Sequence, residues 1–158
     1  MKPIEKLKPM PPTPEEEMCH CKRKGPILLR SALGPFPFYC MECNGEIPIE
    51  ELQIDDCLAE EVAQWLAVHD SLFYLWLDSD EYEAWAKERL LDVKGKVNVE
   101  GLRIAREFDK QRETFFWFFQ DTDDESYVAP KECPFCKKTL KQYGSKNFQI
   151  CSSCKVAV

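Results

Sequence analysis

The sequence predicts an α+β protein in which an acidic helical middle with a buried aromatic strand is flanked by two small four-cysteine zinc ribbons. Three observations lead to this prediction. Paired cysteines lie near both ends, apolar residues in the middle recur at helical spacing, and one aromatic run suits a strand that is buried on both faces. The chain has 158 residues, of which 44% are hydrophobic, so a sizeable core can form without relying on metal alone.

Composition divides the chain into four segments. We predict a disordered, Pro-rich arm at 1–17, an N-terminal zinc ribbon at 18–49, an acidic helical body at 50–128 and a C-terminal zinc ribbon at 129–158. The arm holds five prolines and almost no apolar residues, a composition typical of extended or disordered chain. Because the helical body separates the two ribbons, we expect one integrated unit from residue 18 onward.

The first set of cysteines pairs a tight turn with a knuckle. Cys19-His20-Cys21 is followed, after eighteen residues, by Cys40-Met41-Glu42-Cys43. Strand candidates at 26–30 and 36–39 put the second pair directly after a strand. Cys19, Cys21, Cys40 and Cys43 therefore form a candidate metal site, although His20 could replace a cysteine of its own pair.

The middle of the chain predicts three helices. The first begins at an Asp55 N-cap and repeats apolar residues at three- and four-residue steps as far as Trp76. The second begins at Asp78 with Glu81 in a capping-box arrangement, and the third begins at an Asn98 cap. The predicted inner face of the second helix comprises Tyr82, Trp85, Ala86 and Leu90.

An aromatic strand at 114–119 leads through an acidic loop to the second set of cysteines. Cys133-Pro-Phe-Cys136 and Cys151-Ser-Ser-Cys154 are fourteen residues apart, and the segment between them reads as a hairpin around Gly144-Ser145. Four thiolates close a tetrahedral site and leave no open position. Two disulfides or a redox dithiol pair are the alternatives, but no helix of thioredoxin type follows either pair. Cys57 is the one cysteine outside the two sets, and we predict that it is a small buried core residue.

Charge is distributed unevenly along the chain, whose net charge is −7. Residues 1–49 carry +1, residues 50–128 carry −13 with 21 acidic against 8 basic side chains, and residues 129–158 carry +5. Each zinc ion held by four thiolates adds about −2. The sequence has no apolar run long enough for a membrane span and no signal-peptide pattern, so we expect a protein of the reducing cytoplasm.

The order of these motifs resembles a known family. Cys-x-Cys, Cys-x-x-Cys, acidic helices, a Gly-Leu-Arg-Ile-Ala-Arg-Glu helix at 101–107, an aromatic strand and two further Cys-x-x-Cys pairs follow one another over about residues 19–154. This layout is similar to that of a bacterial family of zinc-ribbon-containing proteins of unknown function. The resemblance implies that this chain binds zinc and nucleic acid. Members of that family carry a further N-terminal domain, whereas only the Pro-rich arm precedes Cys19 here.

A looser resemblance is to the double-CXXCG motif proteins, which act as bacterial immunity proteins. The match departs in detail at the residue after each knuckle. Lys137 and Lys155 stand where glycine would be expected, and Asn44 delays the glycine to Gly45.

Catalysis is not expected. A catalytic zinc keeps one position open for water, whereas both predicted sites are filled by four sulfurs. The sequence has two histidines, His20 and His69, and we interpret His69 as a satisfied structural residue. The carboxylates are numerous but suggest a solvated face more than an acid–base pair.

Two binding functions remain open. The first is an immunity-type protein that masks a basic partner, such as a toxin, with its acidic helices. The candidate contacts are Glu60, Glu61, Asp78, Asp80, Glu81, Glu83 and Glu88. The alternative is nucleic-acid binding through the basic C-terminal ribbon. The candidate contacts are Lys137, Lys138, Lys141 and Lys146. The sequence names neither the partner nor the oligomeric state.

Overall fold

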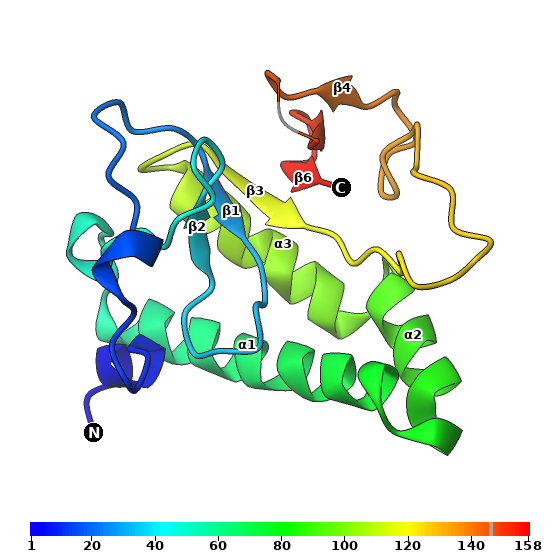
Figure 1. Cartoon of the computed structure of the whole chain (residues 1–158), viewed down its shortest axis with the longest axis horizontal. Coiled ribbons are helices and arrows are strands. Elements are labelled where there is room, and N and C mark those ends of the chain that lie inside the picture. The colour runs from blue at the N-terminus through cyan, green and yellow to red at the C-terminus, as the bar shows by residue number, and fades with distance from the viewer. Residues whose placement is uncertain (146) are drawn as a thin grey trace.

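The computed structural model describes residues 1–145 and 147–158 and has an α+β fold with three α-helices and one six-stranded sheet. The strand order is β2-β1-β3-β6-β5-β4. In Figure 1, α1 runs along one side of the molecule, α3 lies between it and the sheet, and α2 turns back at the far end. Lys146, one of the predicted nucleic-acid contacts, lies outside the described residues.

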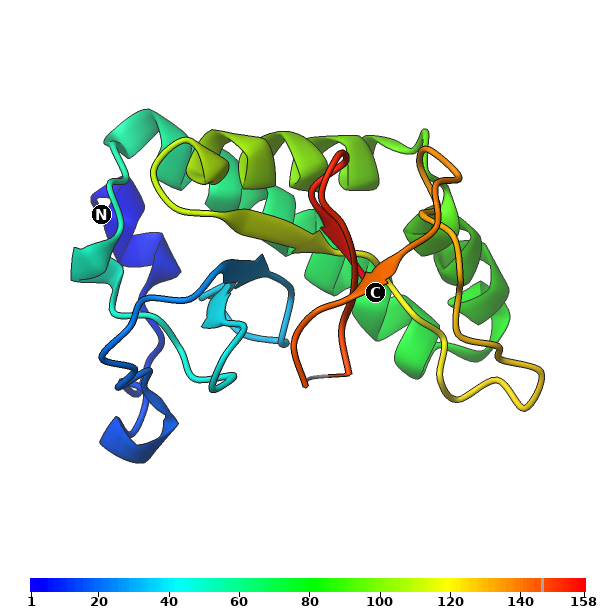
Figure 2. The same ribbon diagram turned by 90° about the horizontal axis from the view of Figure 1, so that it is seen from above.

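The aromatic strand joins the two cysteine-bearing hairpins. Strand β3 (Thr114–Trp117) pairs in parallel with β1 (Ile27–Leu29) on one side and with β6 (Val156–Ala157) on the other. Strand β2 (Phe38–Cys40) is antiparallel to β1. Strands β4 (Lys141–Gln142) and β5 (Gln149–Cys151) continue antiparallel from β6. Figure 2 shows β1 and β2 on one side of β3 and the C-terminal strands on the other.

The predicted first helix is confirmed. Helix α1 (Asp56–Leu77) begins after Asp55, whose carboxylate accepts a hydrogen bond from the Leu58 N–H at 2.8 Å. Its inward face buries a stripe of residues at helical spacing. These residues are Ala59, Val62, Trp65, Leu66, His69 and Leu72.

The predicted starts of the other two helices are wrong by a few residues. Asp78 caps the end of α1 by donating its backbone N–H to Tyr74 O. After the short 3₁₀ turn η4 (Asp80–Tyr82), α2 spans Glu83–Leu91. Ala86 and Leu90 are buried as predicted, but Tyr82 and Trp85 are about half exposed. Tyr82 lies in η4, before α2 begins, and Trp85 is next to Ala86 in sequence and so points about 100° away from it around the helix.

Asn98 caps a different helix from the one predicted. Helix α3 (Lys96–Asp109) begins after Gly95, so Asn98 lies within its first turn. The fully buried Asn98 amide donates to Leu90 O and Asp92 O, both at 2.9 Å. These carbonyls belong to the end of α2, where backbone acceptors lack helical partners. Asn98 therefore fastens α3 to the end of α2.

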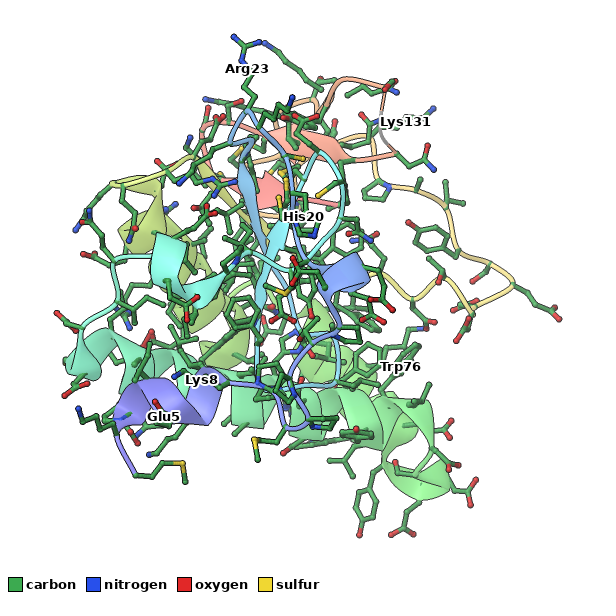
Figure 3. All side chains as sticks on the ribbon, turned by 60° about the vertical axis from the view of Figure 1, so that its left-hand side comes forward. Glu5, Lys8, His20, Arg23, Trp76 and Lys131 are labelled. Carbon is green, nitrogen blue, oxygen red and sulfur yellow. The ribbon has the colours of Figure 1, made fainter. Side chains whose placement is uncertain are left out.

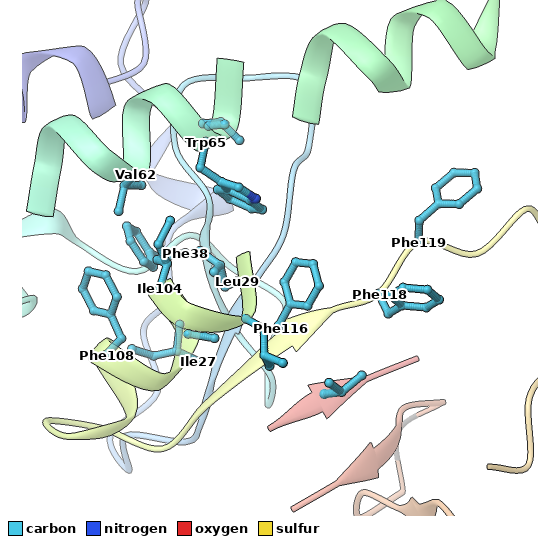
Figure 4. Packing of buried hydrophobic residues seen from close by; sticks show 14 of the residues in the cluster. Ile27, Leu29, Phe38, Val62, Trp65, Ile104, Phe108, Phe116, Phe118 and Phe119 are labelled. Carbon is cyan, nitrogen blue, oxygen red and sulfur yellow. The ribbon is translucent and has the colours of Figure 1, made fainter. Parts of the chain in front are cut away.

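The two faces of the sheet bury different cores. Helices α1 and α3 cover one face, where Trp65 of α1 and Ile104 and Phe108 of α3 pack against Ile27 and Phe116 (Figure 4). The other face carries a smaller cluster around Leu28, Met41, Phe115 and Ala157. Phe115 and Phe116 are both buried, so β3 is covered on two sides, as its aromatic composition predicts.

The N-terminal segment is folded against α1 in place of the disordered arm expected from its prolines. It forms two 3₁₀ turns, η1 (Pro3–Leu7) and η2 (Glu15–Glu17). Leu7 is fully buried in the main core, and Lys6 contacts Glu60 of α1 at 2.6 Å. Ile4 also packs against this core, but two such residues in a Pro-rich, charged segment gave too weak a sequence signal to predict the packing. A third 3₁₀ turn, η3 (Ile49–Glu51), leads towards α1.

Among the described residues, no helix combines the length and apolar character needed to cross a membrane.

Candidate metal centres

The N-terminal cysteine group consists of Cys19, Cys21, Cys40 and Cys43, whose Sγ atoms all lie within 4.8 Å of one another. Cys40 ends β2, and the chain then turns so that the Asn44 N–H reaches Cys40 O at 2.8 Å. The opposing Cys19 is held by its N–H, which donates to Glu46 O at 2.7 Å. One knuckle thus faces one extended segment.

The C-terminal cysteine group consists of Cys133, Cys136, Cys151 and Cys154. Its Sγ atoms also all lie within 4.8 Å of one another. Both pairs are knuckles of one kind. The residue after each second cysteine donates its N–H to the carbonyl of the first, from Lys137 to Cys133 O at 2.9 Å and from Lys155 to Cys151 O at 2.8 Å. All nine cysteines of the chain are free thiols, so neither group is a pair of disulfides in this structure.

The same backbone strain occurs at all three knuckles. Asn44, Lys137 and Lys155 have φ values of 62°, 63° and 61°. This left-handed region favours glycine, and a side chain there costs about 1 kcal/mol or more. The missing glycines noted in the sequence therefore do not change the turn, which keeps the left-handed geometry with a non-glycine residue.

Glycine is required at position 45 because another backbone segment lies very close to it, and not because of a positive φ. A Cβ at this position would lie 2.9 Å from the Met18 carbonyl and from the Cys19 backbone nitrogen. Real Cβ atoms do not come this close to backbone. Gly45 thus lets the Cys19 segment lie directly against the knuckle.

His20 faces away from the sulfur atoms. Its Nε2 lies 2.8 Å from Glu15 O, and the side chain is 60% exposed. Figure 3 shows the imidazole labelled beside the cluster of yellow sulfur atoms. In this structure the four thiols of the N-terminal cysteine group therefore come together without the histidine.

Thiol ionisation is tuned unevenly within each group. Burial raises the pKa of Cys19 to about 12 and also raises that of Cys133. The Lys138 N–H lowers the pKa of Cys136 to about 7. Burial opposes ionisation of Cys43, but the Gly45 N–H and the neighbouring thiols together lower its pKa. Four sulfurs this close cannot all ionise unaided, because each new thiolate is repelled by the others; a bound dication removes that obstacle.

The two groups differ in exposure. Cys133 and Cys151 are almost fully buried, and the other two cysteines of the C-terminal group are half-buried. In the N-terminal group Cys43 is exposed. Cys21 and Cys43 also line an open surface pocket of about 770 Å³ together with residues 11–14. Each donor set is complete for a metal ion that prefers four sulfur ligands, with the N-terminal one open to solvent on one side.

A hydrogen bond links the two cysteine-bearing ends. Tyr143, beside the C-terminal hairpin, donates its hydroxyl to the carboxylate of Glu42, which lies inside the Cys40–Cys43 knuckle. Burial is the main reason that the pKa of Tyr143 is raised, and the Glu42 contact adds to it. Lys155, directly after the last knuckle, pairs instead with Asp109 at the end of α3 at 3.0 Å and with Glu113 before β3 at 3.5 Å.

Two other sequence predictions need correction. Cys57 is exposed on the first turn of α1, 3.9 Å from Glu61 Oε1, and is not a core residue. His69 is buried as predicted, but its Nδ1 has no hydrogen-bond partner among the described residues. The adjacent Asp70 instead accepts from Ser31. Burial lowers the pKa of His69 to about 4, so its imidazole is neutral at pH 7.

The structure separates the predicted partner-binding acids into two sets. Glu60 pairs with Lys6 at 2.6 Å, Glu61 with Arg103 at 2.7 Å and Glu88 with Arg89 at 3.2 Å. Within the part of the chain that the structure describes, no Lys or Arg forms an ion pair with the remaining four. These are Asp78, Asp80, Glu81 and Glu83, and all four lie where α1 turns into α2.

The predicted nucleic-acid contacts lie at the other end of the molecule. Lys137 and Lys141 are exposed, and Lys138 Nζ is 3.4 Å from Ser153 Oγ. Sequence reasoning missed a second basic element, the loop at 22–24, which shares a surface hollow with Glu42 and therefore lies near Tyr143. Three consecutive basic residues directly after Cys21 were the available signal. Figure 3 shows Arg23 and Lys131 far from Trp76.

Comparison of the chain with protein-family models, with curated proteins and with solved structures finds no match.

Proposed function

We propose that each cysteine group holds one structural Zn²⁺ ion. Four sulfurs within 4.8 Å of one another support this assignment, because zinc takes tetrahedral thiolate sites and needs no further ligand. A mass spectrum of the native protein should show two zinc ions, and denaturation should release both. A spectrum with no metal, from protein that still melts cooperatively after chelation, would contradict the proposal.

The function that we propose is non-catalytic binding of a basic protein partner. The observation that carries it is the set of four acids at the α1–α2 turn that have no cation of their own. From residue 31 to residue 86 the sequence contains no Lys or Arg at all. Glu60 and Glu61 of α1 are paired with cations from η1 and α3, whereas these four acids keep their full negative potential. Such a surface steers a positive partner into place.

This chemistry is compatible with an immunity-type role, which we propose. Enzymes that cleave nucleic acids have positive clefts, and a negative surface on a rigid scaffold can cover such a cleft. We therefore propose a bacterial cytoplasmic protein that neutralises a cognate toxin. A reducing cytoplasm would keep the eight metal-binding thiols free of disulfides.

Affinity capture on the immobilised holo-protein tests this function. A basic protein should be retained at low salt and released as salt rises, because screening weakens the attraction. A triple variant, Asp78→Lys with Asp80→Lys and Glu81→Lys, should lose it. The control pair Glu60→Lys and Glu61→Lys changes charge at the acids that are already paired and should retain it. Retention by the triple variant would contradict the proposal.

Nucleic-acid binding is a second candidate, favoured by one observation. The basic loop at 22–24 and the lysines of the C-terminal hairpin lie at the same end of the molecule. Against it, the nearby aromatic rings are already engaged: Phe135 packs on Phe118, and Phe148 on Trp117. A mobility shift with single-stranded DNA, lost when Lys137, Lys138 and Lys141 become Glu, would favour this candidate over the first.

A further inference from the structure

Large apolar side chains are exposed at the turn between α1 and α2. Tyr74 is 54% exposed, Leu77 48%, Tyr82 52% and Trp85 46%. All four come from one stretch of twelve residues. We call this surface, together with Asp78, Asp80 and Glu81, the acidic corner. Four half-exposed large side chains in so short a stretch are more than the scattered apolar residues of an ordinary surface, and they suggest an interaction site.

The acidic corner is held in a fixed shape by its own hydrogen bonds. The Asp78 N–H donates to Tyr74 O at 3.1 Å, and the Asp80 N–H donates to the Glu83 carboxylate at 3.2 Å. The Ser79 hydroxyl donates to Leu75 O. Below the surface, Trp76 packs on Phe73 and Phe119. The exposed side chains therefore project from ordered backbone, so a partner would not have to order the chain in order to bind it.

The nearest cations do not neutralise the acidic corner. Lys87 shares a surface hollow with Leu77 and Glu83, but its ammonium group is engaged by Asp121 at 2.5 Å and Asp124 at 2.8 Å. Arg89 pairs with Glu88, and its guanidinium lies 5.4 Å from the centre of the Trp85 ring. Trp85 remains 46% exposed beside this guanidinium, so part of its ring surface is free to contact a partner.

We propose that the acidic corner docks a basic amphipathic helix of the protein partner. Tyr74 and Leu77, and likewise Tyr82 and Trp85, are three residues apart along their helical segments, a spacing that receives the apolar stripe of another helix. Arg and Lys flanking that stripe would meet Asp78, Asp80 and Glu81. A partner cannot bind the acidic corner by adding a strand to the sheet, because this corner is helical. The edge strands β2 and β4 belong to the cysteine-bearing hairpins. The inference rests on the proposed function and specifies its partner.

The test uses the full-length holo-protein and labelled peptides of about 16 residues, or about four helical turns. One peptide places Leu on one helical face and Arg on the flanks; a second has the same composition in scrambled order. Fluorescence anisotropy at an ionic strength of about 0.15 M measures their affinities. We expect the amphipathic peptide to bind at least about tenfold more tightly than the scrambled one. Tyr82→Ala with Trp85→Ala should remove that advantage, since Tyr and Trp are frequent hot spots.

Val68→Ser is the matched control, because Val68 is 54% exposed on α1 beside the paired Glu61 and Arg103. It should leave both affinities unchanged. Leu77→Ser repeats the test at a second apolar position, and two bound zinc ions with an unchanged melt show that each variant is folded.

The outcomes separate the two proposals. If the apolar variants bind the amphipathic peptide as well as the wild type does, but the Asp78→Lys, Asp80→Lys and Glu81→Lys variant does not, the acidic surface stands and the helix-docking inference fails. If the charge variant also binds normally, the proposed function fails with it. If both peptides bind equally to the wild type, the helix-docking inference is also overturned, because the apolar stripe would then make no difference to affinity.

Discussion

In the C-terminal cysteine group two knuckles face each other, whereas in the N-terminal group one knuckle faces an extended Cys-x-Cys segment. The first arrangement buries Cys133 and Cys151 within the core. The second leaves Cys43 exposed and relies on Gly45 to let the Cys19 segment approach. The contrast teaches that four sulfurs can converge through different amounts of local backbone support. Four measurements test this difference between the groups.

The largest difference should come from removing one cysteine in each group. Cys151→Ser places a hydroxyl in the core next to β6 and abolishes a site on which strand pairing depends, so we expect a loss of about 4 kcal/mol or more. Cys43→Ser alters an exposed ligand and should cost less, about 1–3 kcal/mol. Urea unfolding, together with metal content from native mass spectrometry, compares the two. Equal losses would mean that exposure does not distinguish the groups.

Acid should weaken the core between the groups as well as the groups themselves. His69 has a pKa of about 4 when folded and about 6.5 when unfolded. Below pH 6.5 the unfolded chain therefore binds a proton that the folded chain does not. Stability falls by about 3 kcal/mol as pH drops from 6.5 to 4.

His69→Leu removes this contribution together with the unpartnered Nδ1. Any pH dependence that remains in the variant then belongs to thiolate protonation and metal release. Unfolding curves at several pH values, with metal content followed in parallel, measure both parts. An unchanged slope in the variant would refute the assignment to His69.

A methyl group should distinguish the close approach at the N-terminal group. Gly45→Ala brings a Cβ within 2.9 Å of the Cys19 segment, and the strain should cost about 2 kcal/mol and weaken one metal site. Gly34→Ala is the control, because nothing lies within 4 Å of its Cβ position and its φ is not positive. Competition with a zinc-binding dye reads out the first metal released. If both alanine variants released metal alike, the packing argument would be wrong.

The smallest expected effect is a gain. Lys137→Gly relieves a left-handed backbone at a knuckle of the C-terminal group and should stabilise the protein by about 0.5–1 kcal/mol. Lys155→Gly should gain less or lose, because it also removes the ion pairs with Asp109 and Glu113. Thermal melts should give Lys137→Gly the higher Tm of the two variants, and an equal or lower Tm would contradict this reasoning.

Local patterns were enough to predict much of this molecule. The spacing of the cysteines indicated both groups, because a knuckle is fixed by a few neighbouring residues. The Asp55 cap and the apolar periodicity gave α1 its correct start. What failed depended on distant contacts. Asn98 looks like an N-cap in sequence, yet it serves the end of the preceding helix.

Exposure was the other source of error. The aromatic spacing of Tyr82 and Trp85 suits an inner face, but Tyr82 belongs to η4, and α2 buries Ala86 and Leu90 without the two aromatic rings. Leu7 shows the converse, because one buried side chain holds a segment whose composition indicates disorder. The pairing of β3 with strands on both sides could not be predicted either, since parallel partners lie far apart in sequence and leave no local signal.

That central position of β3 has a consequence for how the chain folds. Ile27 pairs with Thr114, and Phe116 with Val156, so the sheet is completed only by closing long loops. Each cysteine-bearing hairpin, in contrast, needs only residues that are close in the sequence and the Zn²⁺ ion that we propose for it. We expect folding to start separately at the two hairpins and to finish when both dock on the aromatic strand. Zinc supply would then set the rate of the early steps, and loop closure the rate of the last.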